Sequence, residues 1–230
     1  MVVITYDTSV NDNFKTSNKE FSDEVDRILN DPRGWLKYGY KFIRDANATF
    51  QIRLETENNA NALCHANGLS CARPTLNSII IHERNWNGNS KSQLPLKEYH
   101  NYVICHEVGH LLGLSHKQCP IKECQRRGMK ECPASVMQQM TRGPAAISPC
   151  IENDWPLDPD WGIDNPPHTI KEYPASVMKH GGIDNPPHKI KRHFIIICII
   201  IIICIICIFF IRIIFSQIIY KVPDEVRQFV

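Results

Sequence analysis

Several features that would assign the chain to common functional classes are missing. Its 26 basic and 24 acidic side chains nearly balance, and no block of basic residues is present that could grip a phosphate backbone. Nucleic acid is therefore not an expected partner. The first residues, MVVITYDTSVNDNF, have neither the basic start nor the long apolar run of a secretory signal peptide. If the protein is attached to a membrane, we expect the attachment at the other end of the chain.

A polar face is missing from one long segment near that end. Residues 194–211, FIIICIIIIICIICIFFI, are apolar without interruption, and the apolar character resumes after Arg212 through Tyr220. A helix of roughly 20 apolar residues spans the hydrocarbon core of a bilayer, whereas a helix buried in a soluble domain shows a polar face. The sequence therefore predicts a single-pass membrane anchor, with a transmembrane helix over 194–220 and a short tail over 221–230.

Two features disagree about the side of the membrane on which the rest of the chain lies. Lys189, Lys191 and Arg192 form the denser basic cluster, and they precede the apolar run, which favours a cytoplasmic N-terminal domain. Cysteine usage favours an oxidising compartment, because an even set of six cysteines lies in loop-like stretches. These six are Cys64, Cys71, Cys119, Cys124, Cys132 and Cys150. The sequence leaves the side open.

Hydrophobic patterning predicts an α+β domain over residues 1–156. The expected strands are 2–6, 49–54 and 77–83, and the expected helices are 18–30 and 96–114. Regular signals fade after Ser115.

A duplicated segment follows this domain. GIDNPPH occurs at 162–168 and 182–188, and PASVM occurs at 133–137 and 174–178. Two proline-rich copies are too few for a solenoid. We interpret residues 157–193 as a proline-rich linker.

The segment CHEVGHLLGLSH, residues 105–116, predicts a zinc site. His106 and His110 are four apart and share one face of a helix. Gly113 can adopt the turning conformation that brings His116 round as a third ligand. Three imidazoles leave a tetrahedral Zn²⁺ with one open position, where Glu107 can accept a proton from bound water. The alternatives are a helix with ordinary histidines and a zinc site without turnover.

These five residues resemble the HExxHxxGxxH zinc signature of the metzincin metallopeptidases. The resemblance implies a zincin domain with a mixed twisted sheet, an active-site helix and an irregular C-terminal subdomain. In that subdomain a methionine turn lies beneath the metal. Met137 matches the turn methionine, with Met140 as the alternative, whereas Met178 is interpreted as a duplication remnant. Metzincins hold an extended peptide against an edge strand, for which NSIIIHE at 77–83 is the candidate.

Residues 1–156 resemble more closely a metzincin-like domain of unknown function that is common in secreted actinobacterial proteins. The matching segments are DPRGW at 31–35, HEVGHLLGLSHKQCP at 106–120, VMQQ at 136–139, and Cys150 with NDWP at 153–156. The six loop cysteines allow fifteen connectivities. We expect Cys64–Cys71, Cys119–Cys150 and, closing an inserted loop, Cys124–Cys132. Cys105 should face the core.

The resemblance implies a zinc-dependent endopeptidase that acts on a peptide or protein substrate. The alternative is a membrane-tethered, non-catalytic zinc-binding protein with a structural or interaction role, and a third possibility is hydrolysis of a non-peptide amide. No propeptide with an inhibitory cysteine is expected ahead of the domain. The sequence indicates neither the cleaved bond nor the oligomeric state.

Overall fold

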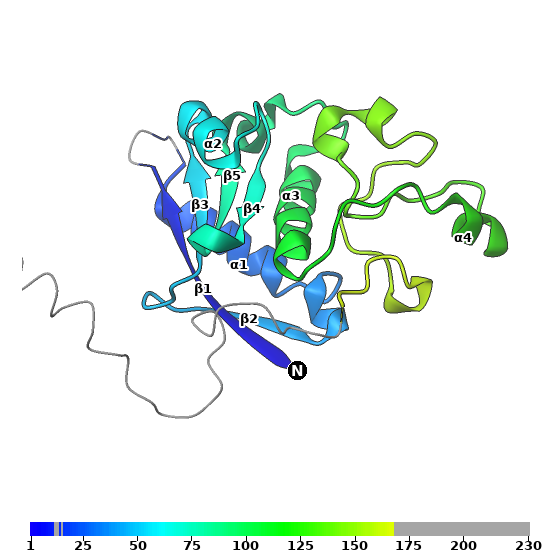
Figure 1. The fold of residues 1–230 in the computed structure, drawn as a ribbon, viewed down its shortest axis with the longest axis horizontal. Helices are drawn as coiled ribbons and strands as arrows, with labels where there is room; N and C mark the ends of the chain where they lie inside the picture. The colour runs from blue at the N-terminus through cyan, green and yellow to red at the C-terminus, as the bar shows by residue number, and fades with distance from the viewer. Residues whose placement is uncertain (12–13, 15, 168–230) are drawn as a thin grey trace, which may run out of the picture. The chain divides into compact units, whose positions relative to one another are not determined.

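The computed structural model describes residues 1–11, 14 and 16–167 (Figure 1). The predicted transmembrane helix over 194–220, the tail, Met178 and most of the predicted linker lie outside these residues. Within the described part of the chain, no helix is both long enough and apolar enough to cross a membrane.

Five strands form one mixed sheet in the order β2-β1-β3-β5-β4. β2, β1, β3 and β5 pair in parallel along the sheet, and the short β4 runs antiparallel to β5 at one edge. The bounds are β1 Val2–Val10, β2 Tyr40–Arg44, β3 Gln51–Glu55, β4 Cys71–Arg73 and β5 Ser78–His82. The expected mixed sheet of an α+β domain is confirmed.

Helices α1 and α3 pack together beside this sheet (Figure 1). α1 begins at a capping box, in which Ser17 and Glu20 satisfy each other's backbone N–H groups, and its apolar face covers β1. α3 lies against β4 and β5. The α-helices are α1 Asn18–Leu29, α2 Glu57–Cys64, α3 Leu96–Leu111 and α4 Ile121–Arg126. Short 3-10 turns are η1 Trp35–Tyr38, η2 Pro74–Leu76, η4 Met140–Arg142, η5 Pro144–Ala146 and η6 Pro159–Trp161, and η3 Asn85–Asn89 is a π-helical turn.

The prediction that NSIIIHE is the edge strand is wrong. β5 lies between β3 and β4, and all five of its residues are buried. An apolar run of this kind suits an interior strand that is covered on both faces. The edge strand next to β5 is β4, where the sequence analysis predicted no strand.

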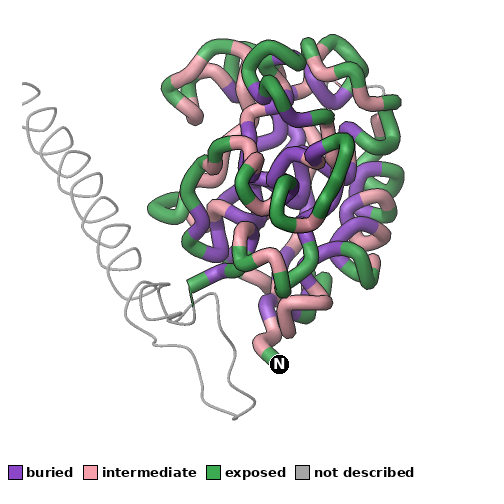
Figure 2. The backbone as a smooth tube through the Cα atoms, turned by 90° about the vertical axis from the view of Figure 1, so that its right-hand side faces the viewer, coloured by how far each residue is buried: buried purple, intermediate pink, exposed green. Residues whose placement is uncertain are grey.

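The chain after α3 is largely irregular and is held by two disulfides, Cys119–Cys150 and Cys124–Cys132. A third, Cys64–Cys71, joins α2 to β4, so all three expected pairings are confirmed. Cys105 is free and buried, as expected. Figure 2 shows the buried segments gathered inside the domain.

The folded domain continues beyond the predicted boundary at Pro156. Leu157 and Asp164 are buried, although both fall in the segment interpreted as linker. The Asp164 carboxylate accepts hydrogen bonds from the Ser135 hydroxyl and from the backbone N–H groups of Val136 and Leu157. These contacts join residues 157–164 to Ser135 and Val136.

Candidate metal centre

The end of α3 places the third histidine opposite the first two. Gly113 has φ +88°, a conformation that costs a residue with a Cβ about 1–2 kcal/mol. Its N–H donates to His110 O at 3.0 Å, and the N–H of Leu114 donates to Gly109 O at 2.9 Å. This Schellman pattern stops the helix and reverses the chain, so His116 returns toward the helix as the sequence predicted.

Backbone carbonyls fix the orientation of the two helical imidazoles. His106 Nδ1 lies 2.8 Å from Val136 O, and His110 Nδ1 lies 2.8 Å from Leu114 O. Because a carbonyl only accepts, each Nδ1 carries the proton, and in a neutral ring Nε2 then holds the lone pair. Burial lowers the pKa of all three histidines, that of His106 to about 3, which favours this neutral form.

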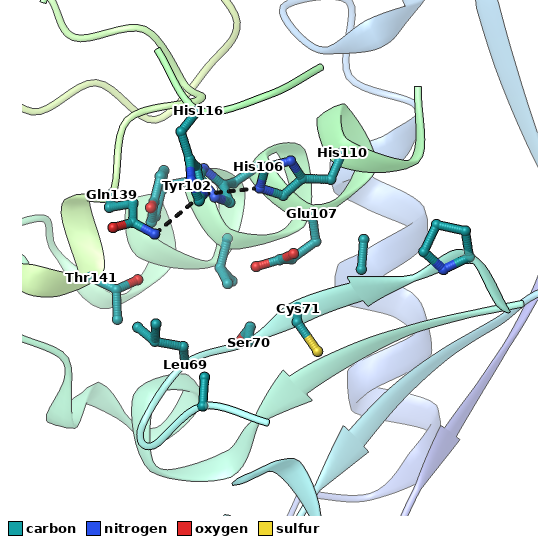
Figure 3. Close-up of a pocket in the computed structure, with 14 residues that line it drawn as sticks. Leu69, Ser70, Cys71, Tyr102, His106, Glu107, His110, His116, Gln139 and Thr141 are labelled. Carbon is teal, nitrogen blue, oxygen red and sulfur yellow. Dashed lines mark hydrogen bonds between the residues drawn. The ribbon is translucent and has the colours of Figure 1, made fainter. Parts of the chain in front are cut away.

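The three imidazoles converge closely enough to share one metal ion (Figure 3). One ligand nitrogen from each of His106, His110 and His116 lies within 4.8 Å of the others, and the Nε2 atoms of His110 and His116 are 3.2 Å apart. Tetrahedral zinc with Zn–N bonds of about 2.0–2.1 Å requires ligand nitrogens roughly 3.3 Å apart. The donor set and the His110–His116 spacing therefore fit zinc, although they do not identify the metal.

Met137 packs against α3, the helix that carries His106 and His110. It is fully buried, and its Sδ atom fills the space beside Gly109 that a Cβ would occupy. The turn that carries it is fastened to α3 at two further points: the Tyr102 hydroxyl donates to Gln138 O at 3.0 Å and accepts from the Met140 N–H at 3.0 Å. Met137 therefore packs against α3 at Gly109, one residue after Val136, whose carbonyl orients His106.

Glu107 points into the cavity that contains the three imidazoles (Figure 3). The cavity has a volume of about 390 Å³ and lies between α3 and the edge strand β4. Glu107 is buried, and its Oε2 atom has no hydrogen-bond partner among the described residues. Burial raises the pKa of this carboxyl to about 8, while a backbone hydrogen bond at Ala72 opposes the rise. Burial thus makes the charged form of this carboxyl unfavourable.

The cavity also contains residues that were not predicted as part of the site. Leu69, Ser70 and Ala72 bring the edge of the sheet to the histidines, and Gln139 Nε2 lies 3.2 Å from His116 Nε2. Tyr102 precedes His106 by four positions, a spacing that could have placed it on the same helix face. The short strand β4 has no comparable signal in the sequence.

The comparison with known proteins covers the whole of this site. Residues 2–161 match the family described as "Protein of unknown function (DUF3152)", and no curated protein matches the chain significantly. The matched range contains the sheet, the three histidines, Glu107 and the turn around Met137. With well over half of its residues matched, the chain belongs to the DUF3152 family.

Proposed function

We propose that this protein is a zinc-dependent endopeptidase, with zinc held by His106, His110 and His116. The observation that carries the proposal is Glu107, whose buried carboxyl group lies in the cavity of the three imidazoles and has one oxygen without a hydrogen-bond partner among the described residues. Burying such a group is costly, and a site kept only for stability has no use for it. The resemblance of residues 106–116 to the metzincin signature supports the same conclusion.

The roles of the side chains follow from their positions. Zinc, when bound, would lower the pKa of a water molecule and polarise the scissile carbonyl. Glu107 accepts the proton of the attacking water and returns it to the departing amine. The Val136 and Leu114 carbonyls hold two imidazoles in the ligand tautomer.

The position of β4 supports a peptide as the substrate. β4 pairs only with β5 and forms the edge of the described sheet, beside the cavity. A free strand edge binds an extended peptide through main-chain hydrogen bonds, and side-chain pockets then supply specificity. A peptide added along β4 would pass between this strand and α3, which places its carbonyls near Glu107.

The proposal is tested by zinc content and casein cleavage of the full-length protein and its Glu107→Gln variant. We expect one zinc per chain in both and a loss of cleavage of about 10²–10⁴-fold in the variant. Glu98→Gln changes an exposed glutamate in the first turn of the same helix, and this control should cleave like the wild type.

Each alternative result has a defined meaning. Undiminished cleavage by Glu107→Gln would remove Glu107 from the mechanism. One zinc per chain with no cleavage of casein or of a peptide library would favour a zinc site kept for stability. Absence of zinc in the wild type, with zinc supplied, would refute the metal centre itself.

A further inference from the structure

A second cavity adjoins the metal cavity and has a different chemical character. Its volume is about 460 Å³, and it shares Leu69 and Thr141 with the first. It is lined by three cationic side chains, those of Arg84, Lys91 and Arg142, and by one carboxylate, that of Glu57. We call this cavity the basic pocket.

The positive charge of the basic pocket is largely uncompensated. Within the described part of the chain, Arg84 is the only one of the three cations with a carboxylate inside 4 Å, and its Nη1 lies 3.8 Å from Glu57 Oε1. The exposed fractions of the Arg84 and Glu57 side chains are 58% and 50%, so solvent screens this ion pair and makes it weak. Lys91 and Arg142 are exposed, and neither has a carboxylate within 4 Å among the described residues. An anion that enters the pocket would therefore meet a net positive field.

Hydrogen bonds hold the backbone around these cations in place. Asn85 Nδ2 donates to Gly68 O at 2.8 Å, which ties the turn after β5 to the loop before β4. The Lys91 N–H donates to Thr141 O at 3.2 Å, and the Thr141 hydroxyl lies 3.0 Å from the Tyr99 hydroxyl of α3. The pocket walls are thus fixed relative to the helix that holds the histidines.

The direction of β4 places the basic pocket along the path of a bound peptide. Gly68 and Leu69, which line the pocket, lie three and two residues before the start of β4. Antiparallel pairing is the more stable arrangement per residue, and it is the one that β4 already makes with β5. A peptide paired antiparallel to β4 has its C-terminal side toward Leu69. Residues that follow the scissile bond would therefore reach the basic pocket.

We propose that Arg84, Lys91 and Arg142 form a specificity site that binds a substrate carboxylate on the C-terminal side of the scissile bond. The carboxylate belongs either to an aspartate or glutamate side chain or to the free C-terminus of the peptide. This inference rests on the proposed peptidase function, and it adds the class of substrate: peptides that carry a negative charge just after the cleaved bond.

Binding without turnover tests the inference directly. The zinc-loaded, full-length Glu107→Gln variant is titrated into fluorescein-labelled decapeptide mixtures, and binding is followed by fluorescence anisotropy. The mixtures are randomised except at one central position, which is Glu, Gln or Lys, and all end in an amide. A fourth mixture has the central Gln and a free C-terminal carboxylate, so it separates the two sources of charge.

The inference predicts that the Glu mixture or the free-acid mixture binds about tenfold more tightly than the amidated Gln mixture, with the Lys mixture weakest. Adding Lys91→Glu and Arg142→Glu should abolish this preference, because two exposed charges are reversed. Lys41→Glu is the matched control, since Lys41 is an exposed lysine of β2, at the opposite edge of the sheet. It should leave the preference unchanged.

The outcomes separate this inference from the proposed function. Equal binding of the Glu, Gln and free-acid mixtures, or no binding of any of them, overturns the specificity site. A preference for acidic peptides that survives the reversal at Lys91 and Arg142 also overturns it. If acidic peptides bind as predicted but the protein with Glu107 intact hydrolyses none of them, the carboxylate site stands and the peptidase function fails.

Discussion

Replacing Gly109 with alanine tests how closely the turn that carries Met137 packs against α3. A Cβ at this position would lie 2.3 Å from Met137 Sδ and 3.1 Å from an atom of the Trp35 ring. Both neighbours are buried, and the Trp35 indole N–H is also held by the Cys105 carbonyl at 3.1 Å. Neither side chain can move into solvent, so the methionine turn has to shift away from the helix.

The magnitude follows from two opposing effects. Overpacking a close-packed site costs about 1–3 kcal/mol, and an overlap of this size belongs at the upper end of that range. Alanine in place of glycine inside a helix contributes about 1 kcal/mol in the favourable direction. The expected net loss of unfolding free energy is therefore about 2 kcal/mol. Zinc affinity should fall as well, because Val136, whose carbonyl orients His106, belongs to the displaced turn.

The assay is urea denaturation of the metal-free protein, followed by tryptophan fluorescence, together with zinc titration of the folded state. Met137→Ala alone should cost about 2–5 kcal/mol through the cavity that it leaves. The double variant Gly109→Ala with Met137→Ala should cost at least about 1 kcal/mol less than the sum, because the new methyl group enters that cavity. A Gly109→Ala protein as stable as the wild type would refute the packing described here.

Three further changes have expected outcomes. Burial raises the pKa of Asp164, so the contribution of this side chain to stability is complete below about pH 4 and is lost as the pH rises through the raised pKa. The stability of Asp164→Asn relative to the wild type should therefore increase from pH 4 to pH 7 in urea titrations. A difference that stays constant with pH would contradict this. Replacing Cys64 and Cys71 with serine should lower the unfolding free energy by about 2–3 kcal/mol without reductant, and should have no effect beyond that of reduction itself when reductant is present. Gly113→Ala should cost about 1–2 kcal/mol and weaken zinc binding in calorimetry, whereas Gly39→Ala, with φ +85° and open space around it, should show a similar strain but unchanged zinc affinity.

The cluster of three histidines could be predicted because its geometry is local. His106 and His110 are one helical turn apart, and the turn at Gly113 follows within three residues, so no distant contact is needed to bring His116 back. The buried strands β1, β3 and β5 were predicted for a similar reason, since each carries a run of apolar or alternating residues.

Features that depend on distant contacts could not be predicted in the same way. β4 has three residues, all of them only partly buried, and it exists because β5 offers hydrogen bonds and the Cys64–Cys71 disulfide holds its first residue. The interior position of β5 depends on this pairing, so its assignment to the edge failed. The burial of Asp164 likewise depends on Ser135, which is far away in the sequence.

The histidines on the two sides of the turn at Gly113 belong to different parts of the fold, so a metal bound by all three would affect how long the protein survives. His106 and His110 belong to α3, whereas His116 precedes Lys117, whose N–H donates to Met137 O at 3.1 Å. A bound metal therefore cross-links the helix to the irregular half of the domain, and at a hundred times its dissociation constant it adds about 2.7 kcal/mol to the stability. If the protein has the proposed activity, molecules with bound zinc cleave peptides and resist unfolding. Molecules that have lost zinc unfold more often. Metal loss would convert an enzyme molecule into a substrate for its neighbours, so the metal supply would set the survival of the population through self-digestion.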